Sequence, residues 1–208
     1  MNTILEYYRS GGPVMHAILT VGVLGLAVFL ERVYVIFSNS RGSERAFIDR
    51  VVQMARAGKT DEAVRACGEH RTALTYIGEL ILRSPSRSEG DLQNAADAAS
   101  VAAMPALTRR LHYLPMLANV ATLIGLLGTI FGLREAFSSV ALVSAAERSG
   151  RLASGIAVAL NATGFGLMVA IPLSLAHGWL TGRTELLIER ADEFSVRLIN
   201  ALSARDAA

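Results

Sequence analysis

Two threonines in apolar, glycine-rich stretches are the residues of this chain whose chemistry is most informative. Thr129 lies in GLLGTIFGL, residues 125–133, and Thr163 lies in ATGFGLMVAIP, residues 162–172. Inside a membrane-spanning helix a hydroxyl can meet water, an ion or a carboxylate, none of which lipid supplies. The pattern therefore predicts two helices that line something polar at membrane depth.

The small residues around these threonines indicate close helix packing, because a glycine lets a neighbouring backbone approach. We expect this role for Gly125, Gly128, Gly132, Gly164, Gly166 and Pro172. Thr122 lies seven residues before Thr129 on the same helical face, where it either extends a polar stripe or bonds a neighbouring helix. For Thr129 and Thr163 the alternative to a polar pathway is a hydrogen bond back to a carbonyl of the same helix.

The composition supports membrane-spanning helices as the elements that position these residues. The chain has 208 residues, of which 52% are hydrophobic and 18% charged, and this is too apolar for an ordinary soluble domain. Three apolar segments are long enough to cross a hydrocarbon core of about 30 Å. The sequence predicts an all-α integral membrane protein with transmembrane helices at 14–37, 111–143 and 152–181.

The segments outside the predicted spans divide into two groups, one on each side of the membrane. Most arginines lie in 38–110, a charged segment with helical periodicity, and in the C-terminal helix expected at 182–208. The excess of arginine predicts that both are cytoplasmic, with the amphipathic segment 1–13 and the loop 144–151 on the outside. We expect the helices of the cytoplasmic domain to continue into the second and third spans.

Several functional classes find no support in the sequence. There is no phosphate-binding GxxxxGK[ST] loop and no nucleophile paired with a histidine and an acid, so we predict that the protein is not an enzyme. The net charge is only +2, and the sequence has no stripe of basic residues interleaved with aromatic ones, so no nucleic-acid partner is expected. The histidines lack metal-ligand spacing, and we predict neither a metal nor a cofactor. The single cysteine, Cys67, is expected to be a small buried residue.

The two threonine motifs resemble a known family. LLGTIFGL (126–133) and GIAVALNATGFGLMVAIP (155–172) are similar to the second-span and third-span signatures of the TolQ/ExbB/MotA proton channel family, with the TolQ and ExbB branch closest. The resemblance covers nearly the whole chain. It implies a ring, expected to be a pentamer, in the bacterial inner membrane with a periplasmic N-terminus and a cytoplasmic C-terminus. It also implies an ExbD- or TolR-like single-span partner whose membrane aspartate carries protons past Thr129 and Thr163.

The resemblance has one chemical departure that matters. TolQ and ExbB commonly carry a glutamate in GIAEAL where this chain has Val158, so the third span offers no carboxylate there. Glu135, six residues beyond Thr129, either helps protons enter from the outside or forms, with Arg134, part of a salt-bridged group near the outer interface.

Taken together, these features predict a proton-conducting stator or motor subunit that converts the proton motive force into mechanical work. Two alternatives remain open. In a non-conducting membrane scaffold, the small residues would serve oligomerisation alone. A small-molecule transporter would need a substrate pocket, and the sequence shows no internal repeat of the kind that builds one.

Overall fold

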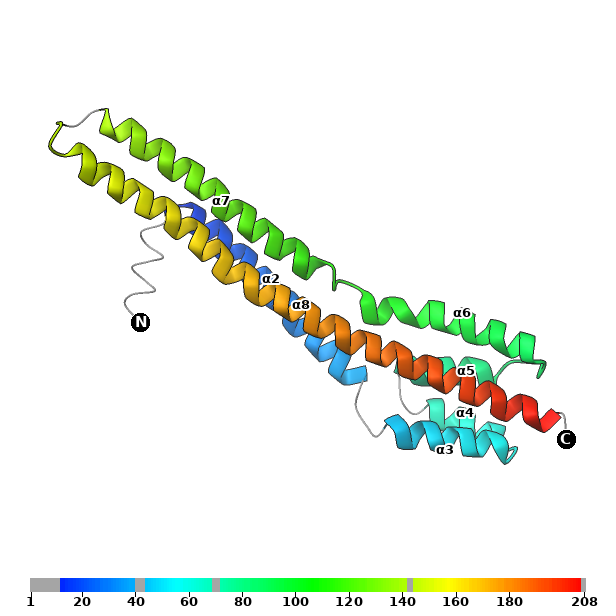
Figure 1. Ribbon diagram of the computed structural model, residues 1–208. Coiled ribbons are helices and arrows are strands. Elements are labelled where there is room, and N and C mark those ends of the chain that lie inside the picture. Colours follow the sequence, from blue (N-terminus) through cyan, green and yellow to red (C-terminus); the bar gives the residue numbers. More distant parts are fainter. Residues whose placement is uncertain (1–11, 40–43, 69–71, 142–143, 207–208) are drawn as a thin grey trace. The chain divides into compact units, whose positions relative to one another are not determined.

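The computed structural model describes residues 12–39, 44–68, 72–141 and 144–206, and all regular secondary structure in these ranges is helical (Figure 1). This confirms the predicted all-α class. Most of the expected N-terminal segment 1–13 lies outside the described residues. The helices are α2 (Val14–Asn39), α3 (Glu44–Arg56), α4 (Thr60–Gly68), α5 (Ala73–Leu82), α6 (Glu89–Thr108), α7 (Tyr113–Val140) and α8 (Arg148–Asp206).

In the described part of the chain, three stretches of helix are long and apolar enough to cross a membrane. Helix α2 covers the first expected span, 14–37, and α7 is a few residues shorter at each end than the second, 111–143. Helix α8 differs more from expectation. It is a single helix of 59 residues that begins within the loop expected at 144–151 and continues past the third span, with Pro172 inside it.

The chain forms two compact units. The span unit consists of the described parts of residues 1–31 and 110–178. The bundle unit consists of the described parts of residues 32–109 and 179–208. Helices α3 to α6 belong wholly to the bundle unit, whereas α2 and α8 each contribute to both.

The boundary between α6 and α7 corrects one expectation. The helix of the polar domain does not continue into the second span, because α6 ends at Thr108 and α7 begins at Tyr113. Between them Arg110 has a φ of 65°, in the left-handed region that interrupts a right-handed helix. Its guanidinium forms an ion pair with Glu31 at 2.6 Å. Continuity into the third span is present, since α8 is unbroken.

The bundle unit has a core of large apolar side chains. Phe194 of α8 is completely buried, and its ring edge approaches Gly78 of α5, where an added Cβ would lie 2.6 Å from the Phe194 Cε1 atom. Cys67 is buried in the same core as expected. Desolvation, followed by the charge of Glu79, raises the pKa of its thiol to about 12.

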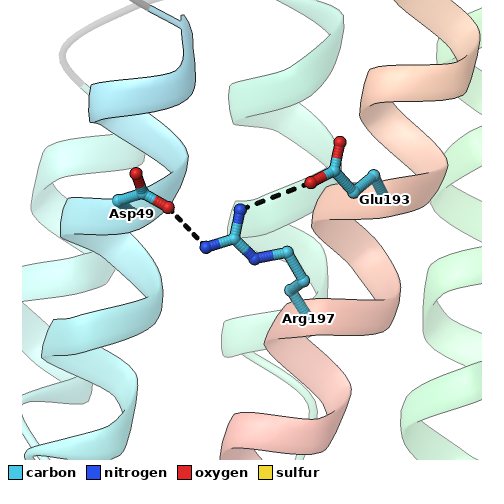
Figure 2. Close-up of polar contacts among 3 residues, drawn as sticks. All are labelled: Asp49, Glu193 and Arg197. Carbon is cyan, nitrogen blue, oxygen red and sulfur yellow. Dashed lines mark hydrogen bonds and ion pairs between the residues drawn. The ribbon is translucent and has the colours of Figure 1, made fainter.

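A group of ion pairs on the surface of the bundle unit links α3 to α8. Figure 2 shows Arg197 of α8 between two carboxylates, with one guanidinium nitrogen on Asp49 of α3 and another 3.4 Å from Glu193 one turn earlier in α8. All three side chains are substantially exposed, so this group ties α3 to α8 without entering the core.

Candidate functional site

One face of α7 buries almost only small residues. Apart from Leu114 near its start, the buried positions recur every three or four residues and are Ala118, Ala121, Gly125, Gly128, Gly132 and Ala136. This spacing places them on one side of the helix. The opposite side carries large exposed apolar residues, which include Leu123, Leu126, Ile130 and Phe131. Such a helix packs its backbone closely against a neighbour and presents its bulk to the surroundings.

The neighbour is α8, which runs antiparallel to α7. A Cβ added to Gly125 would lie 3.1 Å from the carbonyl oxygen of Ala162, and one added to Gly132 would lie 3.0 Å from the Cα atom of Ala159. One added to Gly155 would lie 2.9 Å from the Cα atom of Ala136. The residue numbers of the contacting positions therefore decrease along α8 as they increase along α7, as expected for antiparallel helices. We call this backbone-to-backbone contact the small-residue seam.

Thr163 makes a polar bond across the seam. Its hydroxyl donates a hydrogen bond to the carbonyl oxygen of Gly125 at 3.1 Å. The bond depends on Gly125, because a side chain there would meet the Cα atom of Thr163 at 3.2 Å. The Thr163 side chain is half-buried, and its hydroxyl oxygen keeps acceptor capacity while it donates.

The two threonines of α7 bond within their own helix. Thr129 donates to the carbonyl oxygen of Leu126 at 2.6 Å, and Thr122 donates to that of Ala118 at 3.1 Å. The back-bonding considered as an alternative for Thr129 is therefore present, whereas Thr163 bonds across to the other helix. Gly125, which accepts from Thr163, lies between Thr122 and Thr129 in α7.

The three threonines lie on the same edge of the seam. At 3.6 residues per turn, Thr122 and Thr129 are rotated by about 60° and 40° from Gly125. Thr163 is rotated by about 60° in the same sense from Gly166, which faces the Ala121 carbonyl across the seam. On two antiparallel helices that face each other, equal rotations in the same sense point to the same side. We call this side, defined by Thr122, Thr129 and Thr163, the threonine edge.

Helix α2 covers the opposite edge of the seam. A Cβ added to Gly22 would lie 3.2 Å from Val169, and one added to Gly25 would lie 2.6 Å from Leu173. On α8, Val169 is rotated by about 120° from Thr163, away from the threonine edge. Within the described part of the span unit, α2 thus closes one edge and leaves the threonine edge without a covering helix.

The remaining predicted residues lie apart from this edge. Glu135 is exposed near the end of α7 and is rotated by about 120° from Thr129, so the structure does not bring it to the threonines. Arg134 is exposed beside it. Gly164 is half-buried in α8, and Pro172 is an exposed position at which α8 continues. Gly128 and Gly166 lie in the seam with Gly125.

The described part of the span unit has few carboxylates. Between residues 12 and 31 and between 110 and 178, the carboxylates are Glu31, Glu135 and Glu147. Val158, where the resemblance would place a carboxylate, is half-buried in α8. Among the described residues, no group of three or more histidine, cysteine, aspartate or glutamate side chains could hold a metal. Among the described residues, the span unit therefore brings no carboxylate to the middle of the threonine edge.

Sequence reasoning missed the acceptor that Thr163 uses. The carbonyl of Gly125 has no side-chain signature, and its role follows only from the pairing of the two helices. A signal for the alanines was present, because Ala118, Ala121 and Ala136 continue the three- and four-residue spacing of the predicted glycines. Counting alanines with glycines would have identified the whole seam.

Comparison with known proteins identifies relatives of this chain. Residues 42–193 match the sequence profile of the MotA/TolQ/ExbB proton channel family. A putative biopolymer transport protein ExbB homolog from Methanothermobacter thermautotrophicus is 30% identical over 190 residues, which are 91% of this chain and 67% of that protein. The putative ExbB-like protein 3 from Synechocystis is 31% identical over 166 residues, 78% of this chain and 77% of that one. The Tol-Pal system protein TolQ from Pseudomonas aeruginosa is 39% identical over 100 residues, 45% of this chain and 43% of that one.

Proposed function

The chain belongs to the MotA/TolQ/ExbB proton channel family, and from that premise we propose that it is a stator subunit that converts the proton motive force into mechanical work. Its relatives ExbB and TolQ are multi-pass inner-membrane proteins and not enzymes. In the proposal, several copies, expected to be five, form a ring around a single-span ExbD- or TolR-like partner. The N-terminus is periplasmic, and the polar helical domain and the C-terminus are cytoplasmic.

The observation that carries the proposal is the threonine edge. Thr122 and Thr129 lie about 10 Å apart along α7, and Thr163 lies on α8, all on the side of the seam that α2 leaves uncovered. A carboxylate at membrane depth is costly unless it is neutral or meets polar groups, and the described part of the span unit supplies none beside these threonines. An aspartate on the partner's helix is the group that this edge is suited to receive.

The chemistry of Thr163 suits a transient contact with such an aspartate. A hydroxyl can donate to the ionised carboxylate and accept from the protonated acid, so it stabilises both states without fixing either. When it turns toward the aspartate, Thr163 releases the carbonyl of Gly125, and when the aspartate leaves, the bond across the seam re-forms. Each proton that crosses about 100 mV supplies about 2.3 kcal/mol of work from the electrical term.

One observation favours a non-conducting scaffold as the second candidate. The hydroxyls of Thr122, Thr129 and Thr163 all donate to carbonyls of the span unit. In that arrangement they could act only as packing contacts beside the small-residue seam, which would then serve assembly alone. The two candidates differ in whether the Thr163 hydroxyl is required once the helices are assembled.

The test is proton flux into liposomes that contain the assembled complex of this protein with its partner. Thr163→Val removes the hydroxyl at nearly constant volume. We expect it to reduce flux about tenfold or more, because a hydrogen bond to a charged group is worth about 1.5–3 kcal/mol. Thr163→Ser keeps the hydroxyl and should retain most of the flux. Replacing the partner's aspartate with asparagine should abolish it.

Thr122→Val is the matched control, since Thr122 is a threonine of the same edge that bonds only within α7. We expect a smaller effect than at Thr163. A stably assembled Thr163→Val complex that conducts normally would contradict the proposed pathway. The scaffold would be supported by two results together. The complex would show no proton flux with or without the partner's aspartate, and the Thr163→Val variant would remain functional in cells.

A further inference from the structure

A small hollow in the bundle unit lies where two of the predicted spans end. Its volume is about 80 Å³, and it is lined by Ile36, Phe37, Arg183, Leu186, Leu187 and Arg190. One buried water needs roughly 10–15 Å³ by this kind of measure, so the hollow accommodates a phosphate-sized group but not an acyl chain. The first expected span ends at residue 37 and the third at residue 181, which places the hollow at the level of the lipid headgroups.

Both cations of the hollow belong to one face of α8. Arg183 and Arg190 are seven residues apart, a separation that returns to the same face after about 10.5 Å. Glu185 and Glu189, the acidic residues of this stretch, are rotated by about 160° and 120° from Arg183 and do not line the hollow. The hollow is therefore lined by two arginines and four apolar residues, with neither glutamate among them.

Aromatic residues surround the same place. The ring of Phe37 stacks on that of Trp179 with centroids 6.1 Å apart, and the guanidinium of Arg183 lies 5.8 Å from the Trp179 ring centroid. Tyr34, one turn before Phe37, is 70% exposed. Exposed tryptophan and tyrosine side chains are typical of the membrane–water interface. This setting distinguishes the hollow from a pair of arginines on a water-exposed surface.

We propose that this hollow binds the phosphate of an anionic glycerophospholipid, with Arg183 and Arg190 as its ligands and with the acyl chains lying along Phe37 and Leu186. Guanidinium groups bind phosphate with paired, charge-assisted hydrogen bonds. The cytoplasmic leaflet is rich in anionic lipid, and the proposed topology places the hollow there. The inference rests on that topology and is independent of proton conduction.

Trp179 provides the measurement, because it is the only tryptophan of the chain. The purified protein is reconstituted in phosphatidylcholine bilayers that contain increasing amounts of brominated phosphatidylglycerol or, separately, brominated phosphatidylcholine. Bromine quenches tryptophan fluorescence on contact, so the two titrations give the relative affinity of the site for anionic over zwitterionic lipid. We expect a preference of about fivefold for each arginine engaged, from about 1 kcal/mol for each basic residue near an anionic surface.

Two variants separate a built site from general charge. Arg190→Gln leaves the contact between Arg183 and Trp179 in place and should reduce the preference about fivefold. Arg183→Gln with Arg190→Gln should abolish it. The control, Arg45→Gln with Arg56→Gln, removes two exposed cations of α3 and should keep the wild-type preference. Each ratio compares two lipids in one variant, so any change in tryptophan yield cancels.

Three outcomes would overturn the proposal. They are equal quenching by both lipids in the wild type, an unchanged preference in the double variant, and an equal loss in the Arg45 and Arg56 control. Millimolar inorganic phosphate should leave the preference unchanged. If phosphate removes it, the site takes free phosphate and the lipid assignment is wrong. Because the readout needs neither a partner nor a proton gradient, it can fail or succeed independently of the proposed function.

Discussion

Helices α7 and α8 of the span unit contact each other mainly through their smallest residues, whereas large apolar side chains fill much of the core of the bundle unit. In the span unit the contact is made by Gly125, Ala162 and Gly166, while Leu126 and Phe131 remain about half exposed. In the bundle unit Phe194 and Leu198 are completely buried. The same chain thus follows two opposite packing patterns.

The difference reflects what surrounds each unit. In water, burial of large apolar side chains drives association and is worth about 25 cal/mol for each square ångström. Against lipid tails that driving force is absent, so close backbone contact and hydrogen bonds must hold the helices together. The bond from Thr163 to the Gly125 carbonyl therefore belongs to the same pattern as the small-residue seam. A polar group suited to function is positioned by the contact that stabilises the unit.

The largest effect should come from removing a large buried side chain of the bundle unit. We expect Phe194→Ala to lower the free energy of unfolding of this unit by about 3–5 kcal/mol. The readout is the reactivity of Cys67, the single cysteine, which lies in the same core. Because burial raises the pKa of its thiol to about 12, Cys67 stays protonated and unreactive in the folded protein near neutral pH. The variant should be labelled much faster.

The matched change in the span unit is Leu126→Ala. Leu126 is 52% exposed, and if its side chain faces lipid, truncation removes no contact that holds the helices together. We expect its effect on the stability of the assembled protein to stay within about 0.5 kcal/mol. A loss of stability as large as that from Phe194→Ala would mean that Leu126 packs against another protein surface. The two units would then differ in their protein partners and not in the solvent that surrounds them.

An intermediate effect is expected from filling the seam. In Gly166→Ala the new Cβ would lie 2.8 Å from the carbonyl oxygen of Ala121 and 3.2 Å from the Cα atom of Gly125. Because these are backbone atoms, the helices must separate, at a cost of about 1–3 kcal/mol. The measurement is thermal stability of the purified oligomer together with proton flux, since separation should also lengthen the bond from Thr163 to Gly125.

Gly178→Ala is the control for this change. Gly178 lies in the same helix, but a Cβ there would meet nothing within 4 Å. We expect stability to stay equal or to rise slightly, because alanine is the better helix former. If both variants lose stability equally, the cost is a property of the helix backbone and the seam is not what limits packing.

The sequence predicted the membrane helices well because their signals are local. Apolar length is enough to identify α2, α7 and the membrane part of α8. Spacing is enough to place Gly125, Gly128 and Gly132 on one face of α7. The threonine motifs and the resemblance pointed to the family that the comparisons identify. Each of these inferences needs only the residues of a single helix.

What the sequence did not predict depends on pairing between helices or on one unusual backbone angle. The break before α7 rests on the positive φ of Arg110, which is a non-glycine residue, and on its pairing with Glu31, which is 79 positions away. The acceptor of Thr163 is a backbone carbonyl on another helix. The position of Glu135 away from the threonine edge requires the orientation of α7 against α8, and distance along the sequence alone suggested that it was near.

The finest test of the contrast between the units concerns their ion pairs. Arg110 with Glu31 in the span unit and Arg197 with Asp49 in the bundle unit have similar exposure. Exposed pairs contribute little, because water weakens the attraction between the charges and pairing costs side-chain entropy, and salt weakens the attraction further. We therefore expect Asp49→Asn to shift the unfolding midpoint of the bundle unit by a few degrees at most, and high salt should remove the difference.

The Glu31→Gln variant should lose more stability than Asp49→Asn, and its loss should be less sensitive to salt. The reason is that Glu31 holds Arg110 in a left-handed conformation that a non-glycine residue otherwise disfavours. Arg110→Gly adopts that conformation without strain and removes the guanidinium, so Glu31→Gln made in the Arg110→Gly background should have almost no further effect. Equal salt sensitivity of Glu31→Gln and Asp49→Asn would show that the pair at the start of α7 is an ordinary surface contact and that the break between α6 and α7 does not depend on it.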